Sequence, residues 1–274
     1  MNDGRKEPLG FAPDAQKSVK QLFDLSGRVA LITGGSRGLG LAMAEALGDM
    51  GAKVAITARK PDELEAALVH LHARGLHAES FINDLSKSDT IGPMVAGVME
   101  KLGPIDVLIN NAGASWGAPM EEHPLEAWQK VVDLNLTGTF RVTQEVGVRS
   151  MIPRRYGRIV NIASVAGLQG AHPHVMRAIA YQTTKGGLVN FTRALAAEWG
   201  QYNIVVNAIC PGFIVTQMSR GLLDKVADRV KLNTPLRQLG LEQDLLGLAV
   251  LFSSEASRHI TGQIIAVDGG SSIV

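Results

Sequence analysis

Short apolar segments alternate with longer amphipathic segments from Gly27 to the end of the chain. Segments such as 39–51 and 188–202 carry apolar residues at spacings of three and four, which indicates helices. The apolar runs predict buried strands at residues 28–33, 53–58, 77–83, 106–112, 157–164, 204–210 and 263–268. Such alternation implies parallel strands joined by right-handed crossovers, with helices on both faces of one sheet. The predicted fold is therefore α/β, a single-domain doubly wound parallel sheet of about seven strands.

The start of the chain differs from the rest in composition and in periodicity. Residues 1–25 are polar and punctuated by proline and glycine, without sustained periodicity. We expect them to form an N-terminal extension that is partly mobile. No break in composition divides residues 26–274, which we expect to form one domain that includes the substrate loops.

Composition and charge narrow the possible partners. The formal net charge is +1, from 27 basic and 26 acidic side chains, so the sequence predicts neither a broad nucleic-acid surface nor an anionic-membrane surface. No segment approaches the roughly 20 consecutive apolar residues of a membrane helix. Cys210 is the only cysteine, which excludes an internal disulfide and a cysteine-based zinc cluster. A single thiol fits a reducing compartment, and we expect a cytoplasmic protein.

A glycine cluster follows the first predicted strand. Residues 33–40 read TGGSRGLG, with Gly34, Gly38 and Gly40 placed to turn the chain tightly before a helix. Backbone N–H groups and the helix dipole at this point would favour a pyrophosphate. A plain tight turn would also explain the glycines, but their place between a strand and a helix favours dinucleotide binding.

Three further strand ends carry polar or small residues. Asp84 could accept a hydrogen bond from an adenine amino group, or could cap a helix. Residues 110–113, NNAG, would leave room for the flat surfaces of a cofactor, and residues 210–216, CPGFIVT, combine a rigid turn with a hydroxyl. Ordinary loop chemistry could account for each alone. Their common position at the carboxyl ends of strands, where such sheets bind ligands, favours a site.

Tyr181 and Lys185 are four residues apart, so on a helix they project from one face. An ammonium beside a phenol favours the phenolate and lowers the tyrosine pKa from about 10, which would make Tyr181 a usable acid and base. The pair alone could be incidental. Ser164, at the end of the fifth predicted strand, could bind the same substrate oxygen, and Asn135 stands in a helical stretch where asparagine is disfavoured.

In their order and spacing, the segments TGGSRGLG, NNAG, LNLTG, NIASVAG, YQTTK, CPGFIVT and VDGG resemble the short-chain dehydrogenases/reductases over residues 26–274. The resemblance implies a Rossmann-like fold and a catalytic tetrad of Asn135, Ser164, Tyr181 and Lys185. Tyr181 would exchange a proton with the substrate oxygen, which Ser164 would polarise. Lys185 would bind the nicotinamide ribose and lower the tyrosine pKa, and Asn135 would hold a water that links Lys185 to solvent. The reaction needs no metal, and none is expected.

The second strand end predicts the cofactor. Ala58 occupies the position where NAD-specific proteins commonly place a carboxylate against the ribose 2′-hydroxyl, and Arg59 follows it. Arg37 could meet a 2′-phosphate from the other side, so we expect NADP(H). The expected cofactor-binding residues are Gly34, Ser36, Arg37, Gly38, Leu39, Gly40, Arg59, Asp84, Leu85, Asn111, Ala112, Gly113, Tyr181, Lys185, Pro211, Gly212, Ile214 and Thr216.

These features predict an enzyme that acts on CH–OH groups and interconverts a small-molecule ketone and a secondary alcohol, as a ketone or 3-oxoacyl-type reductase. A sugar-acid or polyol dehydrogenase of the same family is an alternative, and so is a cofactor-binding regulatory protein without turnover. The segment between Ser164 and Tyr181 is about four residues longer than usual in the family. His172, His174 and Arg177 lie in it and are the kind of residues that decorate a solvated loop. Their charge also motivates the hypothesis of a polar or acidic substrate.

The residues that follow Lys185 in the predicted helix indicate contacts between subunits. Phe191, Leu195 and Trp199 form a stripe at helical spacing, which could also be buried within one subunit. Gly186 and Gly187 would permit close approach of another helix. The family resemblance implies a homotetramer, or failing that a dimer.

Overall fold

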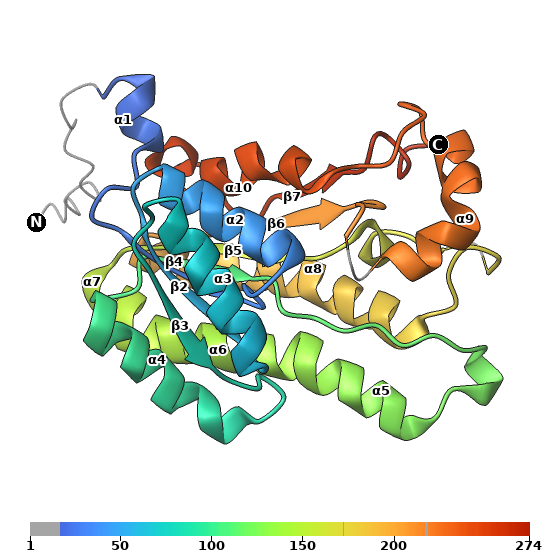
Figure 1. Cartoon of the computed structure of the whole chain (residues 1–274), viewed down its shortest axis with the longest axis horizontal. Helices are drawn as coiled ribbons and strands as arrows, with labels where there is room; N and C mark the ends of the chain where they lie inside the picture. The colour runs from blue at the N-terminus through green and yellow to red at the C-terminus, as the bar shows by residue number, and fades with distance from the viewer. Residues whose placement is uncertain (1–16, 172, 217–218) are drawn as a thin grey trace, which may run out of the picture.

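A computed structural model describes residues 17–171, 173–216 and 219–274 (Figure 1). Its strands are β1 Val29–Thr33, β2 Lys53–Ala58, β3 Ala78–Ile82, β4 Val107–Asn110, β5 Gly157–Ile162, β6 Ile204–Pro211 and β7 Ile264–Val267. Every predicted strand is present. The predicted ranges 106–112 and 157–164 run past the ends of β4 and β5, because the apolar and small residues there continue into loops that border the site.

Helices connect these strands. They are α1 Val19–Phe23, α2 Gly38–Asp49, α3 Pro61–Ala73, α4 Ser88–Leu102, α5 Leu125–Val132, α6 Thr139–Val146, α7 Ile152–Arg154, α8 Ile179–Trp199, α9 Arg220–Asn233 and α10 Leu246–Ser253. Two π-helical stretches, Asp133–Gly138 and Gly147–Met151, join α5, α6 and α7 into a nearly continuous helix. Short 3₁₀ turns complete the connections at Met120–Glu122, Val165–Gly167, Gly200–Tyr202, Glu242–Leu245 and Glu255–Ser257.

All seven strands run parallel in one sheet of order β3-β2-β1-β4-β5-β6-β7. The chain builds outward from β1 toward β3, then crosses back and continues from β4 toward β7. This reversal places a switch point between β1 and β4, where the connections leave in opposite directions and open a crevice. The predicted doubly wound α/β fold is confirmed.

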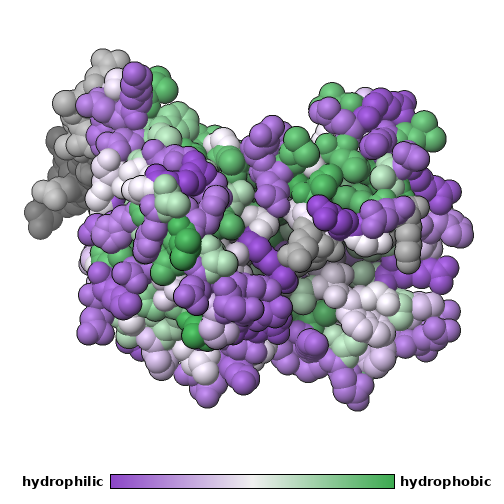
Figure 2. All heavy atoms as spheres, in the orientation of Figure 1, coloured by the Kyte–Doolittle hydropathy of each residue, from purple (hydrophilic) through white to green (hydrophobic). Residues whose placement is uncertain are grey.

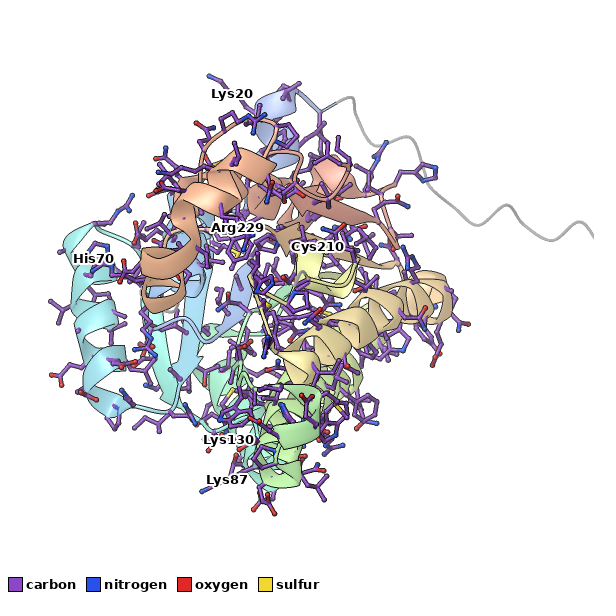
Figure 3. All side chains as sticks on the ribbon, turned by 90° about the vertical axis from the view of Figure 1, so that its right-hand side faces the viewer. Lys20, His70, Lys87, Lys130, Cys210 and Arg229 are labelled. Atoms are coloured by element: carbon purple, nitrogen blue, oxygen red, sulfur yellow. The ribbon has the colours of Figure 1, made fainter. Side chains whose placement is uncertain are left out.

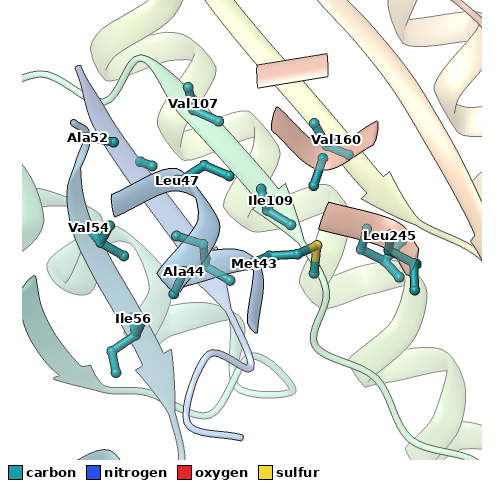
Figure 4. Close-up of a cluster of buried hydrophobic side chains, with 14 of the residues drawn as sticks. Met43, Ala44, Leu47, Ala52, Val54, Ile56, Val107, Ile109, Val160 and Leu245 are labelled. Carbon is teal, nitrogen blue, oxygen red and sulfur yellow. The ribbon is translucent and has the colours of Figure 1, made fainter. Parts of the chain in front are cut away.

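Successive strand residues face opposite sides of the sheet and build two cores. On one side, Met43 and Leu47 of α2 lie against Ile109 of β4 (Figure 4). The same cluster contains Ile32 of β1 and residues of α3 and α10. On the other side, Leu31 packs with residues of α4, α6 and α8. Because both faces are covered at the centre of the sheet, β1, β4 and most of β2 are continuous apolar runs, whereas the edge strand β3 carries Glu79 and Ser80 and is only partly buried.

The described part of the N-terminal segment is anchored at its end. Ser18 caps α1, and Leu25 is 1% exposed, with its N–H donating to the Met50 carbonyl at 2.9 Å. Residues 1–16 of the predicted extension lie outside the described residues, so the division at residues 25 and 26 stays a prediction. No helix in the described part of the chain is both long and apolar enough to cross a membrane.

Candidate active site

A cavity of about 600 Å³ opens at the carboxyl ends of the strands. Most of the residues predicted to bind a cofactor or substrate line it. They are Gly34, Ser36, Arg37, Gly38, Leu39, Arg59, Leu85, Asn111, Ala112, Gly113, Ser164, Tyr181, Lys185, Pro211, Gly212, Ile214 and Thr216. Three predicted residues, Gly40, Asp84 and Asn135, do not line the cavity. Residues at the ends of six strands, β1 to β6, thus line one cavity.

The glycine loop forms the wall between β1 and α2. Gly34 has φ +66°, a left-handed conformation that glycine adopts without strain, and its N–H donates to the Thr57 carbonyl at 2.8 Å. A Cβ at Gly40 would lie 2.2 Å from the Gly34 carbonyl oxygen, so only glycine lets the first turn of α2 approach the loop this closely. Gly40 therefore supports the glycine loop without lining the cavity itself. The amino end of α2 then faces the cavity, as a pyrophosphate requires.

Asp84 holds a turn instead of lining the cavity. Its Oδ1 accepts from the Ser86 N–H at 3.1 Å and from the Ser86 hydroxyl at 2.8 Å. Partial burial acts to raise the pKa of Asp84, but the hydrogen bonds from Ser86 outweigh it and hold the pKa below its ordinary value. Asn83 and Leu85, its neighbours, line the cavity. The helix-cap alternative is wrong, because the N-cap of α4 is Lys87; the Asp84 carboxylate bonds Ser86, two residues further along the chain.

One end of the cavity is cationic. Arg37, Arg59 and Lys60 line it together with Ala58, whose small side chain leaves the end of β2 without a carboxylate. Glu63, in the first turn of α3, also lines this end; its Oε1 accepts from Arg37 at 3.0 Å and from Lys60 at 2.8 Å. We call these four charged residues the cationic end.

The other end carries Ser164, Tyr181 and Lys185. Ser164 caps the 3₁₀ turn that follows β5, and its Oγ accepts from the Ala166 N–H at 3.1 Å. Tyr181 and Lys185 lie one turn apart on α8, with the ammonium 5.6 Å from the centre of the phenol ring. The Lys185 ammonium donates to the Ile162 carbonyl at 2.6 Å. The predicted same-face placement of the pair is therefore present in the structure.

The pKa values at this end are governed by burial. Burial raises the pKa of Tyr181, and a hydrogen bond with Ser164 acts in the opposite direction. Burial also lowers the pKa of Lys185 to about 8. The expected lowering of the tyrosine pKa by Lys185 is absent from the causes that act on Tyr181 here. Burial is the largest contribution and disfavours the phenolate, so desolvation decides the direction of the shift at Tyr181.

Asn135 lies beneath the cavity, inside the π-helical stretch Asp133–Gly138. Its Oδ1 accepts from the Ala114 N–H at 2.9 Å, and its Nδ2 donates to the Ala114 carbonyl and the Thr184 hydroxyl, both at 3.0 Å. A Cβ at Gly113 would lie 3.4 Å from the Asn135 oxygen and 3.7 Å from the Lys185 nitrogen. Asn135 thus joins α8 to the loop after β4, and the widened turn explains an asparagine within a helix.

The lengthened segment between Ser164 and Tyr181 contributes apolar residues to the cavity. Val175 and Met176 line it, whereas Arg177 is exposed and donates from Nε to the Pro173 carbonyl at 3.3 Å. His174 is exposed, and His172 lies outside the described residues. The hypothesis that Arg177 contacts the substrate is therefore not supported by its position in this structure.

Sequence reasoning missed two functional positions. Thr33 accepts with Oγ1 from the N–H groups of Asn111 and Ala112 at 3.0 and 3.1 Å, which fixes the NNAG loop to the end of β1. The other is Glu63, in the cationic end. A polar residue closing an apolar strand could have indicated Thr33. No sequence signal separated Glu63 from the other acidic residues of α3, Asp62 and Glu65.

Cys210, labelled in Figure 3, is the penultimate residue of β6, is buried, and packs with Leu188 and Val189 of α8. Burial raises the pKa of its thiol to about 11, so the side chain is neutral at physiological pH. It serves as a small apolar residue behind the cavity wall.

Comparison with known proteins places this arrangement among enzymes. The short chain dehydrogenase family matches residues 28–227. The chain is 38% identical over 258 residues to gluconate 5-dehydrogenase of Gluconobacter oxydans, covering 93% of this chain and 99% of the relative. It is 37% identical over 247 residues to a 3-oxoacyl-[acyl-carrier-protein] reductase of Aquifex aeolicus, covering 90% and 98%.

A solved structure is similar over the same extent. The crystal structure of a gluconate 5-dehydrogenase from Burkholderia cenocepacia in complex with NADP and tartrate superposes with a TM-score of 0.88 at 32% identity. The match covers 94% of this chain and 100% of that one. The glycine loop, the cavity and the Tyr181–Lys185 pair thus occur in a chain whose named relatives are a dehydrogenase and a reductase.

Proposed function

The chain belongs to the short-chain dehydrogenase family, and on that premise we propose that it is an NADP(H)-dependent oxidoreductase that interconverts a ketone and a secondary alcohol. One observation carries the proposal: Ser164, Tyr181 and Lys185 line the same cavity whose far end is lined by Arg37 and Arg59. A binding protein without turnover would need the cationic end but not the hydroxyl, phenol and amine at the other.

The proposed roles follow from position. When bound, the nicotinamide cofactor supplies or accepts the hydride. Tyr181 donates its proton to the carbonyl oxygen during reduction and takes it back during oxidation. Ser164, hydrogen-bonded with Tyr181, orients the same oxygen. Lys185, which donates to the Ile162 carbonyl, resupplies the proton that Tyr181 gives up. Asn135 holds the loop after β4 in place through its hydrogen bond with Ala114.

The residues that line the cavity from the glycine loop to β6 are proposed to hold the cofactor. The fit rests on the cradle at Gly34 and Gly40, which has no room for a Cβ, and on the amino end of α2 facing the cavity. Arg37 and Arg59 would bind the 2′-phosphate through charge-assisted hydrogen bonds, since Ala58 leaves no carboxylate to repel it. Gly40 and Asp84 would support this site without touching the cofactor.

The substrate end favours a ketone reductase over a sugar-acid dehydrogenase. Val175, Met176, Phe213 and Val230 line it, so much of the wall is apolar. Hydroxyl-rich acids are usually bound by charged or amide groups that replace their hydration. The sugar-acid alternative is favoured by the identity to gluconate dehydrogenases and by Gln169 and Asn233, which also line the cavity.

We also propose that the protein assembles as a homotetramer, or as a dimer. Phe140 is 48% exposed and borders a shallow apolar hollow with Leu136, Leu188 and Phe191, which joins α6 to α8. Of the predicted stripe, Leu195 and Trp199 are buried in the subunit, so Phe191 alone is left beside this hollow. Figure 2 shows further hydrophobic side chains beside α9 and the C-terminus, where Leu232, Leu236 and Ile273 are exposed. Covering two such surfaces at once would give a tetramer.

The test is a screen of the purified protein against ketones and alcohols with NADPH, NADH and their oxidised forms, followed by nicotinamide absorbance. We expect turnover with NADPH and an apolar ketone, at a kcat/KM well above that with NADH. Absence of turnover with every pair, together with tight nucleotide binding, would favour the regulatory alternative. Light scattering on the same sample checks the assembly, which a stable monomer at micromolar concentration would contradict.

A further inference from the structure

The Glu63 carboxylate is surrounded by hydrogen-bond donors. It accepts from Arg37 at 3.0 Å, from Lys60 at 2.8 Å and from the Ser36 hydroxyl at 3.5 Å. Its side chain is 24% exposed, whereas those of Arg37 and Lys60 are 52% and 60% exposed. The two cations thus reach inward to a carboxylate that lies deeper than they do. All four residues line the cavity.

These donors form an anion site that the protein fills with its own side chain. A guanidinium, an ammonium and a hydroxyl around one oxygen pair are the groups that bind a phosphate monoester. They stand next to Ala58 and Arg59, at the end of β2 where the adenosine ribose lies in this fold. The hydrogen bond from Lys60 lowers the pKa of Glu63, so the carboxylate is ionised at neutral pH.

We propose that Glu63 is a specificity-determining residue that occupies the 2′-phosphate subsite in the free protein and competes with the cofactor's phosphate for Arg37 and Lys60. The inference rests on the proposed function, because it assumes that the cavity takes NADP(H). A 2′-phosphate must displace the carboxylate from these donors or bind beside a like charge. NAD(H) carries a hydroxyl there and need not break the ion pairs. Glu63 therefore reduces the ratio of affinities for NADP(H) over NAD(H) that the basic residues create.

The expected effect is moderate, because the pairs are partly exposed to solvent. Ion pairs of this kind are screened by water and salt, so removing the competing charge should tighten NADP(H) binding about three- to tenfold. At 0.1 M salt the field of an exposed charge decays over about 10 Å, and this distance shortens as ionic strength rises, so the gain in affinity should shrink as well.

Isothermal titration calorimetry tests this on the full-length protein, with NADP⁺, NAD⁺ and the fragment 2′,5′-ADP as ligands. Glu63→Gln removes the charge while keeping the side-chain size. Asp62→Asn is the matched control, because Asp62 is the exposed neighbour in the same turn of α3 and the change in net charge is identical. We expect Glu63→Gln to lower the Kd of NADP⁺ and 2′,5′-ADP about three- to tenfold, to leave the Kd of NAD⁺ within about twofold, and Asp62→Asn to change each much less.

Two results would overturn the inference and leave the proposed function standing: Kd values for NADP⁺ that are equal in the wild type and Glu63→Gln, or weaker binding by the variant. Weaker binding would mean that Glu63 holds Arg37 in place for the phosphate. If Asp62→Asn tightened NADP⁺ binding as much as Glu63→Gln, the effect would come from the change in net charge alone, and this would also overturn the inference. If the wild type bound neither dinucleotide, the proposed function itself would fail, and the inference with it.

Discussion

The Lys185 ammonium donates to the main-chain carbonyl of Ile162 at 2.6 Å, from α8 to the last residue of β5. The lysine is therefore held in the cavity by the sheet itself. Lys185 is only 5% exposed, and this burial lowers its pKa from the ordinary value of 10.5 to about 8. A proton that leaves near physiological pH is suited to a group that resupplies Tyr181.

The first prediction is that Lys185 titrates apart from the other lysines. With ¹³Cε-labelled lysine, one resonance of the free protein should titrate near pH 8, and Lys185→Met should remove it. Between pH 8 and 10.5 the unfolded chain binds one proton more than the folded one at this residue, so the stability of the wild type relative to Lys185→Met should rise with pH in that window. Urea unfolding at both ends of the window measures this. A pH-independent difference would contradict the buried-lysine assignment.

The second prediction concerns Tyr181. Tyr181→Phe deletes the proposed proton donor and should reduce kcat about 10²–10⁴-fold, while calorimetry should show cofactor affinity within a few fold of the wild type. Tyr202→Phe makes the same chemical change at the far end of the helical segment, outside the cavity lining, and should keep normal turnover. More than about a tenth of wild-type turnover in Tyr181→Phe would be inconsistent with general acid catalysis by this residue.

The third prediction compares the effects of losing Asn135 on the stability of the protein and on its turnover. Asn135→Ala leaves the Ala114 N–H and carbonyl without their partner, and should lower the free energy of unfolding by about 1–3 kcal/mol. Because the same bonds place the loop beside Lys185, turnover should fall as well. Thr184→Val removes one of the three Asn135 hydrogen bonds, together with the bond from the Thr184 hydroxyl to the Tyr181 carbonyl at 2.9 Å. It leaves Ala114 bonded to Asn135 and should cost less on both counts. Urea unfolding and steady-state kinetics on the two variants decide this.

The sequence was sufficient for the fold because both faces of the central strands are buried, which makes strands such as β1 and β4 apolar runs with abrupt ends. It also predicted which strand ends meet, since parallel strands bring Gly34, Asn111 and Ser164 to one edge. It predicted that Tyr181 and Lys185 share a helix face, but it did not predict side-chain direction in the loops or around Glu63. Asp84 bonds Ser86, Arg177 faces solvent, and Glu63 lies among cations. Each depends on local loop geometry or on contacts between distant segments, which periodicity does not encode.

The fourth prediction tests the cofactor preference. Ala58→Asp combined with Arg59→Ile places a carboxylate at the end of β2 and removes one cation, so kcat/KM should shift from NADPH toward NADH. Arg37→Ala alone should weaken NADP(H) binding and leave NAD(H) little changed, because only the phosphate gains from the guanidinium. Comparable kcat/KM for NADH and NADPH in the unmodified protein would show that these side chains do not reach the 2′ position.

The last prediction concerns the wall built by the lengthened segment. Met176 lines the cavity, whereas the adjacent Arg177 is exposed, so the two residues should respond differently to truncation. Met176→Ala should raise KM for an aliphatic ketone about tenfold, since it removes apolar contact from the pocket. Arg177→Ala should leave KM nearly unchanged for every substrate.

Met120→Ala is the matched control for this pair. It makes the same substitution on the 3₁₀ turn after β4, where Met120 is 67% exposed and does not line the cavity. Steady-state kinetics with an aliphatic ketone and with a keto sugar acid distinguish the two substrate classes. An increase in KM for the sugar acid alone in Arg177→Ala would mean that the arginine turns inward when substrate binds, and would favour the sugar-acid dehydrogenase over the ketone reductase.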